Sequence, residues 1–389
     1  MFDCVWDYLK LKIMAMTKWA VFGLFCALLC SCGKQKNEGI PVVELSKAKG
    51  EIDLKLSDLL ENIRVIPLET RPDALLPGHF STWVGEKYIV TLGYDAIHLF
   101  TIDGKYVRKL AERGRGPEEY FDVTGFGVDR QERYCYLASG VNGICVIDLE
   151  KGGIVRKIST GKKMPYRLWY SDKDNTLVYA LFNFGRMEGD ICRIALDGTL
   201  LHAVESSSKS GTLQYFWCMN DTIRYKMQFC DTLFLLADTV KIPYCRMVTE
   251  RPFSMALESG RVISILFENK DRIILCCDEV RKHREGDEFS IFSEHCGYYV
   301  LDKSDFSFRK VRGFYADIFD YTETNFSPKT NFFPLQVSRR KACRNISVLQ
   351  FKELLKDKLD SSLVPEYVKA LYAQLDEEDN PVLLVGDIK

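Results

Sequence analysis

The sequence predicts an all-β chain folded as a β-propeller, and three observations support this. Short apolar segments, each about four to ten residues long, follow one another with turn signals between them. The turn Asp103-Gly104 is echoed at Lys151-Gly152-Gly153 and at Asp197-Gly198, at intervals of about 50 residues, which suits one four-stranded blade per interval. No long helical pattern interrupts this order before the C-terminal segment. We therefore expect six four-stranded blades followed by a short C-terminal helical pair.

The clearest blade fragment is Ile97–Tyr120. An apolar run reaches Asp103-Gly104, whose glycine can take a positive φ, and a second apolar run returns through Leu110. A Gly-rich loop with two arginines follows and ends in Glu-Glu-Tyr. This pattern indicates the outer half of one blade and the crossing to the next.

Later strands are expected at Arg272–Cys277 and Gly297–Asp302, with an exposed hairpin loop at Arg284–Asp287. The repeat is weakest after Val204, so the blades there are inferred from the continuing strand rhythm. Near the N-terminus, Ile63–Leu68 predicts a strand that enters the first or last blade.

The C-terminal segment departs from the strand pattern. Ser347 and Gln350 have the spacing of a capping box, and Pro365 suits the start of a second amphipathic helix, so helices are expected over about 347–376. Asp379-Asn-Pro381 then breaks the helix, and a strand is expected over about 381–388. Pairing of that strand with N-terminal strands would close the ring and remove its open edges.

The charge balance excludes one class of partner. With 53 basic against 54 acidic residues, the chain has no overall field that would draw in nucleic acid or an anionic membrane.

The first 31 residues predict a signal peptide with a start site placed too far upstream. A lysine precedes the apolar run Trp19–Leu29, which is too short to span a bilayer, and Leu29-Cys-Ser-Cys32 resembles a lipobox. Cys32 is therefore expected to carry lipid, residues 32–45 to form a tether, and residues 46–389 to form the propeller. An ordinary signal peptide with a chance cysteine is the alternative. Either reading implies export, and the lipobox implies a lipid anchor in the bacterial envelope, at the outer membrane.

Ten cysteines remain after the anchor, and none forms a Cys-x-x-Cys pair, so spacing predicts no metal site. They are expected to be small apolar strand residues, with a bond between Cys135 and Cys145 as an alternative. The five histidines show no metalloprotease spacing, and no nucleophile motif is present. We therefore assign no catalytic, cofactor-binding or metal-binding residue, although a triad assembled in space stays open.

Two groups of residues are candidates for ligand contact. Arg113 and Arg115 flank a Gly-rich loop that lacks the Lys-Ser/Thr end of a phosphate loop, so these side chains either pair within the loop or meet a ligand at the propeller mouth. Trp169, Tyr170 and Trp217 either stack on sugar rings or pack between blades.

Three stretches carry a resemblance to a known family. They are GKYVRKLAERGRGPEEY at Gly104–Tyr120, IPLET at Ile66–Thr70 and the ending EDNPVLLVGDIK. Together with the lipobox, they resemble the six-bladed β-propeller lipoproteins of gut Bacteroidetes, which have NHL-like repeats. The resemblance implies a propeller fold and an envelope location, and it carries over no catalytic residue.

The expected function is therefore a non-catalytic lipoprotein that binds a ligand or serves as an interaction scaffold. A glycan or another envelope protein is the expected partner, no cofactor is implied, and the lipid anchor is the expected membrane contact. An envelope hydrolase or lyase with its site in the propeller funnel is the alternative. A cluster of acids, bases or metal ligands in the funnel would favour the enzyme, and a lining of Tyr, Trp and Arg would favour binding.

Overall fold

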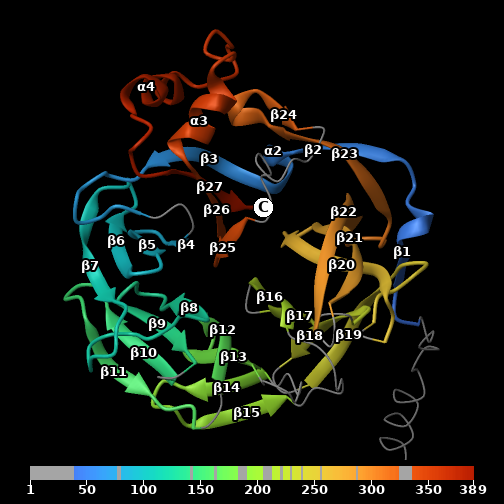
Figure 1. Cartoon of the computed structure of the whole chain (residues 1–389), viewed down its shortest axis with the longest axis horizontal. Helices are drawn as coiled ribbons and strands as arrows, with labels where there is room; N and C mark the ends of the chain where they lie inside the picture. Colours follow the sequence, from blue (N-terminus) through green and yellow to red (C-terminus); the bar gives the residue numbers. More distant parts are fainter. Residues whose placement is uncertain are drawn as a thin grey trace, which may run out of the picture. The chain divides into compact units, whose positions relative to one another are not determined.

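The computed structural model describes residues 39–389 apart from 77–79, 141–142, 162–163, 183–190, 205–212, 220–221, 228–229, 238–239, 255, 286–287 and 324–334. For 182, 213–217, 219, 284–285, 288–289 and 323 only the backbone is described. Val42–Lys389 forms one compact unit. This unit is a propeller of six four-stranded blades, as the sequence predicts (Figure 1).

The first three blades each consist of four consecutive antiparallel strands. Blade 1 contains β4 (Ser81–Val84), β5 (Tyr88–Leu92), β6 (Ala96–Thr101) and β7 (Tyr106–Glu112). Blade 2 contains β8 (Gly125–Val128), β9 (Tyr134–Ser139), β10 (Gly143–Asp148) and β11 (Ile154–Ile158). Blade 3 contains β12 (Met164–Ser171), β13 (Thr176–Phe182), β14 (Ile191–Ala195) and β15 (Leu200–Val204). The fragment Ile97–Tyr120 thus holds the two outer strands of blade 1 and the crossing to blade 2.

Blades 4 and 5 each gain an outer strand from the N-terminal segment. Blade 4 contains β16 (Leu213–Met219), β17 (Thr222–Met227), β18 (Thr232–Ala237) and β19 (Val240–Val248), and β1 (Val42–Glu44) pairs with β19 in parallel. Blade 5 contains β20 (Ser259–Glu268), β21 (Arg272–Glu285), β22 (Glu288–Asp302) and β23 (Phe308–Ala316), with β2 (Glu51–Lys55) parallel and β24 (Tyr321–Glu323) antiparallel to β23. β1 lies within the stretch expected as a tether, and its Val43 is fully buried.

Blade 6 closes the ring with strands from both ends of the chain. It contains β25 (Gln336–Ser338), β26 (Lys341–Ile346), β27 (Val382–Ile388) and β3 (Leu60–Pro67), in that order. β27 pairs antiparallel with β26 on one side and with β3 on the other. Four consecutive β27 residues, Val382–Val385, are 2% exposed or less. Closure therefore rests on an interior strand with a buried apolar surface.

Apolar clusters fill the spaces between neighbouring blades. Blades 1 and 2 share a cluster that includes Trp83 and Leu137, and blades 2 and 3 share one that includes Tyr136 and Leu177. A larger cluster joins the sheets of blades 4, 5 and 6 and the C-terminal helices. Eight of the ten described cysteines are buried, and all ten, including Cys135 and Cys145, are free thiols.

The helices in the described part of the chain are short. They are η1 (Leu45–Lys47), α2 (Leu56–Leu59), η2 (Asp317–Phe319), α3 (Val348–Leu355) and α4 (Glu366–Gln374). Ser347 and Gln350 form the capping box of α3, and Pro365 is the N-cap residue of α4. Figure 1 shows α3 and α4 beside β3 of blade 6, where the backbone N–H of Val65 donates to the Tyr367 hydroxyl at 3.2 Å. In the described part of the chain, no helix has the length and apolar character needed to cross a bilayer.

The hairpin of blade 5 differs from the sequence expectation. The strands expected to stop at Cys277 and to resume at Gly297 continue to Glu285 and from Glu288, paired throughout apart from a bulge at Cys277/Asp278. The largely polar sequence of this extension hid it: β22 is exposed from Ser290 to Cys296, and of the described β21 side chains in the extension only Val280 packs in an apolar cluster, with Phe253 and Val262. The extended hairpin carries side chains that the prediction left outside both strands.

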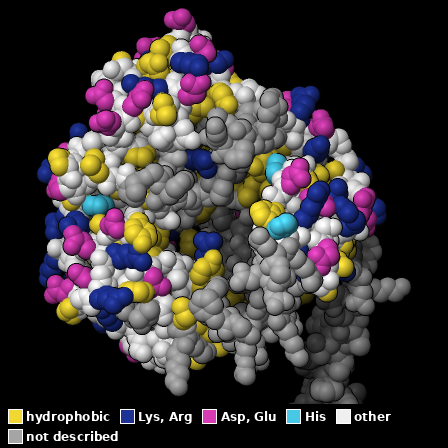
Figure 2. Space-filling view, viewed as in Figure 1, with side chains coloured by type: hydrophobic (Ala, Val, Ile, Leu, Met, Phe, Trp, Pro, Cys, Tyr) yellow, Lys and Arg dark blue, Asp and Glu magenta, His cyan; other side chains and the backbone are white. Residues whose placement is uncertain are grey.

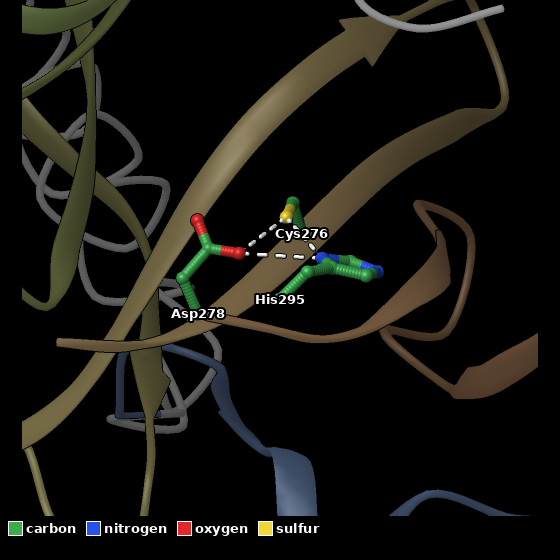
Figure 3. Close-up of side chains that lie close together, drawn as sticks. All are labelled: Cys276, Asp278 and His295. Carbon is green, nitrogen blue, oxygen red and sulfur yellow. Dashed lines mark hydrogen bonds and ion pairs between the residues drawn. The ribbon is translucent and has the colours of Figure 1, made fainter. Parts of the chain in front are cut away.

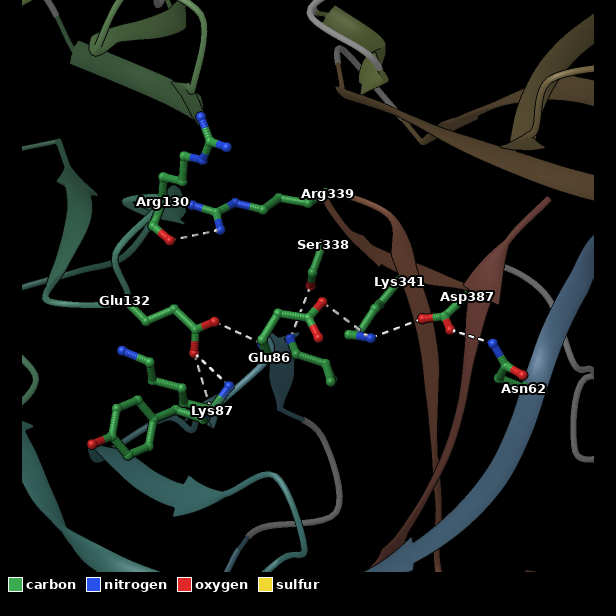
Figure 4. Close-up of polar contacts among 11 residues, drawn as sticks. Asn62, Glu86, Lys87, Arg130, Glu132, Ser338, Arg339, Lys341 and Asp387 are labelled. Atoms are coloured by element: carbon green, nitrogen blue, oxygen red, sulfur yellow. Dashed lines mark hydrogen bonds and ion pairs between the residues drawn. The ribbon is translucent and has the colours of Figure 1, made fainter.

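A buried carboxylate fastens blade 1 to blade 2 (Figure 4). Glu132, 4% exposed, accepts hydrogen bonds from the backbone N–H groups of Glu86, Lys87 and Tyr88 at 2.6, 3.0 and 3.0 Å. Glu132 lies in the turn between β8 and β9, whereas Glu86 and Lys87 lie in the turn between β4 and β5 and Tyr88 is the first residue of β5. These bonds fix the relative position of the two blades at one face of the ring.

Blade 6 is tied together by a second polar chain in Figure 4. Lys341 of β26 contacts Asp387 of β27 at 2.8 Å, and Asp387 accepts from the side chain of Asn62 in β3 at 2.9 Å. Burial alone would raise the pKa of Asp387, but the hydrogen bonds from Lys341 and Asn62 outweigh it and lower this pKa. The closing strand is thus held by ionic contacts as well as by its apolar residues.

Candidate functional site

A cavity of about 630 Å³ opens where the inner strands of blades 1, 2 and 6 begin, and we call it the mouth cavity. Its lining residues are Phe80, Ser81, Leu92, Gly93, Tyr94, Arg113, Tyr120, Asp122, Val123, Gln336, Arg344 and Asn345. The crossing from blade 1 to blade 2 supplies Arg113, Tyr120 and Asp122. The site is therefore built by connections between blades.

A second cavity of about 600 Å³ continues along the propeller axis, and we call it the channel cavity. Residues of β4, β8, β12, β20 and β25 and their flanks line it, including Trp83, Thr124, Arg167, Trp169, Tyr170, Ser264 and Arg339. Ser81, Leu92, Val123 and Gln336 line both cavities. Figure 2 shows hydrophobic and basic side chains around the hollow near the centre of the blades.

The described lining of the two cavities carries four arginines, Arg113, Arg167, Arg339 and Arg344, against one carboxylate. That carboxylate, Asp122, already accepts from the Ser139 hydroxyl at 2.6 Å and the Gly140 N–H at 3.1 Å. No histidine occurs among these described lining residues. The described lining therefore carries more positive than negative charge, although Arg339 is paired with the Asp172 carboxylate.

The Gly-rich loop after β7 holds Arg113 at the mouth. The Glu119 carboxylate accepts from the Gly116 N–H at 2.7 Å and so folds the loop back on itself. The Arg113 Nε donates to the Phe121 carbonyl at 2.9 Å, and its guanidinium carbon lies 4.2 Å from the ring centroid of Tyr94. The guanidinium is therefore positioned in advance beside an exposed aromatic ring.

Tyr120 contributes a hydroxyl that lacks a partner among the described residues. The residue is 1% exposed and lines the mouth cavity, and burial raises its pKa to about 12. A buried hydroxyl without a hydrogen bond costs about 1–3 kcal/mol.

The opposite end of the channel is crossed by Arg339, in the turn between β25 and β26 (Figure 4). Its Nη2 donates to the Val128 carbonyl of blade 2 and to the Asp172 carboxylate of blade 3, both at 3.1 Å. Its Nη1 reaches the Arg130 carbonyl at 3.4 Å. One side chain of blade 6 thus links two blades across the axis and narrows that end.

The candidate ligand residues from the sequence fall in different places. Arg113 lines the mouth cavity, and Trp169 and Tyr170, both in β12, line the channel cavity. Arg115 is exposed, 5.8 Å from the Phe121 ring centroid, and is not among the lining residues. Trp217 belongs to β16, but its side chain lies outside the described part of the chain, as does Cys32.

Sequence reasoning missed several lining residues, among them Trp83, Tyr94, Tyr120, Arg339 and Arg344. Trp83 lies in β4 beside the apolar Val84, and its sequence context does not distinguish it from a core residue. Arg339 and Arg344 belong to blade 6, which is completed by β3 from the N-terminal segment. Only knowledge of that pairing places these two residues at the axis. Among these residues, only Tyr120 had a signal in the sequence, because it is the aromatic residue that ends the Gly-rich loop.

A separate group of reactive side chains lies on blade 5 (Figure 3). Cys276 and Asp278 of β21 and His295 of β22 place one ligand atom each within 4.8 Å of one another. Burial, and then the charge of Asp278, raise the pKa of the Cys276 thiol. None of the three residues is in the described funnel lining.

Comparison with known proteins shows similarity in fold and in family. A proposed exported protein of Bacteroides fragilis has a crystal structure that matches with a TM-score of 0.60 and 13% identity, covering 90% of this chain and 100% of that one. The β-propeller domain of Myceliophteria thermophila Cps50 (Swd1) matches more weakly, with a TM-score of 0.35 and 12% identity over 60% of this chain and 86% of that one. No curated protein matches the sequence. Residues 40–387 match the family described as a domain of unknown function, DUF4934, and the chain belongs to that family.

Proposed function

We propose that this protein is a non-catalytic binding lipoprotein of the bacterial cell envelope, anchored through Cys32 at the outer membrane. Its site is the funnel formed by the mouth and channel cavities. The ligand is an acidic polysaccharide that enters at the mouth. The name of the exported Bacteroides fragilis neighbour agrees with export, and the lipobox supports the lipid anchor.

The lining of the funnel is the observation that carries the proposal. Its described side chains include the exposed Tyr94 and the half-buried Trp169, together with the four arginines. Trp83, Tyr120 and Tyr170 also line it, but they are 6%, 1% and 6% exposed and pack in the cores between blades, where Tyr170 stacks on Tyr136. Flat aromatic rings offer stacking surfaces to sugars, and polar groups at a few fixed positions orient a ligand. A general acid and base would need carboxylates or imidazoles that converge on one point. The described lining instead offers one carboxylate that is already hydrogen-bonded.

The charge of the lining selects among sugars. Guanidinium groups bind carboxylate and sulfate oxygens through paired hydrogen bonds, which are stronger than neutral ones. Arg113 and Arg344 belong to the wider mouth, where a charged ligand first meets the protein. An acidic polymer therefore fits the funnel better than a neutral one.

Affinity electrophoresis in gels containing polygalacturonate, chondroitin sulfate or dextran tests the proposal. We expect the acidic polymers to retard the protein, less so at high salt, and dextran to have no effect. Replacing Trp169 by Ala should weaken binding by about 1–3 kcal/mol. Phe292→Ala, which removes a 60% exposed aromatic ring on the blade 5 hairpin, is the control.

Two results would overturn the binding proposal. Equal mobility in all gels would exclude an acidic polysaccharide and leave a protein partner as the remaining ligand class. Release of shortened products from either acidic polymer, abolished by one funnel substitution, would establish the hydrolase or lyase instead.

The anchor is tested separately. Cys32→Ser should release the protein from the membrane fraction, whereas Cys30→Ser, two residues earlier in the same signal, should leave it there. Membrane retention of the Cys32→Ser protein, with no lipid-modified peptide by mass spectrometry, would show that the anchor is elsewhere.

A further inference from the structure

Three potential metal ligands of different chemistry meet on the blade 5 hairpin. Cys276 and Asp278 are two residues apart on β21, and His295 is the cross-strand partner of Asp278 on β22. Side chains at positions i and i+2 of a strand share a face, and directly paired residues share it too. Figure 3 shows the three side chains turned toward one another.

The distances between the three atoms suit hydrogen bonds among them and are also close to those around a shared metal ion. Cys276 Sγ lies 3.2 Å from Asp278 Oδ1 and 3.3 Å from His295 Nδ1, and the last two atoms are 3.2 Å apart. Zinc bond lengths of about 2.0–2.3 Å at tetrahedral angles place neighbouring ligand atoms about 3.3–3.6 Å apart. A shift of a few tenths of an ångström would therefore seat an ion.

Counting the protons available to the three side chains also favours a shared cation. The thiol carries one proton, Nδ1 carries at most one, and the ionised carboxylate carries none. Two protons can bridge two sides of the triangle, so one close contact always stays without a bridge. A cation in the centre interacts favourably with all three atoms at once.

We propose that Cys276, Asp278 and His295 form a Zn²⁺ site through Sγ, a carboxylate oxygen and Nδ1. Sulfur, nitrogen and oxygen together suit zinc, whereas calcium and magnesium take oxygen ligands. Three protein ligands leave a fourth position for water or a ligand, which distinguishes the site from a closed structural one.

The surroundings allow an ion to reach the site and keep the ligands in place. Cys276 is 7% exposed, whereas the side chains of Asp278 and His295 are 27% and 32% exposed, so the site opens to solvent on one side. The His295 ring lies 4.2 Å, centroid to centroid, from the ring of Tyr298, which limits its rotation. The site is independent of the proposed polysaccharide binding, because none of its ligands lines the funnel.

Metal titration of the purified full-length protein tests the site. The protein is stripped with a chelator and titrated with Zn²⁺ against a competing dye, and with Co²⁺ followed by absorption. We expect about one high-affinity Zn²⁺ per chain and a thiolate-to-cobalt charge-transfer band. Bound Zn²⁺ should also raise the melting temperature.

Ligand and control variants decide which residues are responsible. Cys276→Ser, Asp278→Asn and His295→Gln should each weaken Zn²⁺ binding at least about 100-fold, since loss of an outer-shell partner alone costs 10- to 100-fold. Cys276→Ser should also remove the charge-transfer band. Cys296→Ser, which removes the exposed thiol of the same hairpin, and His283→Gln should bind as the parent does.

Two outcomes overturn the proposal. Zn²⁺ binding by the parent that is no tighter than binding by Asp278→Asn and His295→Gln would exclude the site. Equal loss in Cys296→Ser would assign the metal to surface thiols. Circular dichroism of each variant confirms folding, and if Cys276→Ser fails to fold, the other two ligand variants decide by the same criterion.

Discussion

Removal of the closing strand should abolish folding of the whole propeller. Deletion of Asn380–Lys389 removes Val382, Leu383, Leu384 and Val385, all 2% exposed or less. Burying one such side chain contributes about 1.5–3 kcal/mol, so the four together contribute about 6–12 kcal/mol. That sum matches the entire stability of an ordinary protein, about 5–15 kcal/mol. The deletion also leaves β26 and β3 with open edges in the middle of blade 6.

Urea unfolding followed by circular dichroism measures this effect. The truncated protein should show no cooperative transition, and Leu384→Ala should lower the free energy of unfolding by about 2–5 kcal/mol. Leu349→Ala, on α3 with a 60% exposed side chain, is the control and should change it by less than about 0.5 kcal/mol. A truncated protein that unfolds cooperatively at the parent's midpoint would refute the reasoning.

Three further predictions concern buried and paired charges. Glu132→Gln should lower the free energy of unfolding by about 1–3 kcal/mol, because three backbone N–H groups lose an ionised acceptor, while the exposed Glu150→Gln should not. Burial lowers the pKa of Lys226 to about 8 in the folded protein, so above that pH the unfolded chain binds more protons than the folded one. The free energy of unfolding should therefore rise from about pH 8 toward pH 10.5 in the parent protein, but not in Lys226→Met. Burial would raise the pKa of Asp387, but the hydrogen bond from Lys341 outweighs it and the folded pKa falls below 3.8. The contribution of Asp387 is therefore complete above about pH 3.8 and is lost as the pH falls through the folded value, so Asp387→Asn should flatten acid unfolding below that pH.

Elements with a local signal were predictable from the sequence. The turn Asp103-Gly104 joins β6 to β7 as expected, with Gly104 at φ +83° and its N–H donating to the Thr101 carbonyl. The capping box at Ser347 begins α3, and it was also predictable because its donors and acceptors are only three residues apart in the sequence. The NHL-like character of the repeats stays a prediction.

Elements that depend on distant pairing were not predictable. β1 and β2 are only three and five residues long, and they form by pairing with β19 and β23, far away in the sequence. A short outer strand has no periodicity of its own, since its partner supplies the hydrogen bonds. The N-terminal segment between Val42 and Pro67 consequently contacts three blades, although its composition suggested little more than one strand.

The same physics explains which site residues were found. Arg113 and Trp169 stand out because a Gly-rich loop and an aromatic cluster are unusual within a few residues of sequence. Asp278 and His295 lie beyond the expected ends of their strands, and they become neighbours only because β21 and β22 continue as paired strands. Spacing rules for metal ligands describe loops and helices, so a Cys-x-Asp pair facing a histidine on the next strand satisfies none of them.

The two candidate sites depend on the fold in different ways. The mouth cavity takes its lining from blades 1, 2 and 6, and blade 6 exists only when strands from both chain ends pair. Its geometry therefore varies with any change in ring closure. The three ligands on blade 5 lie on two adjacent strands, whose register is fixed by hydrogen bonds between direct neighbours. Blades move relative to one another more easily than hydrogen-bonded neighbouring strands do. Substitutions that weaken the pairing in blade 6 without unfolding the chain should thus weaken ligand binding at the mouth before they change the geometry of the three ligands on blade 5.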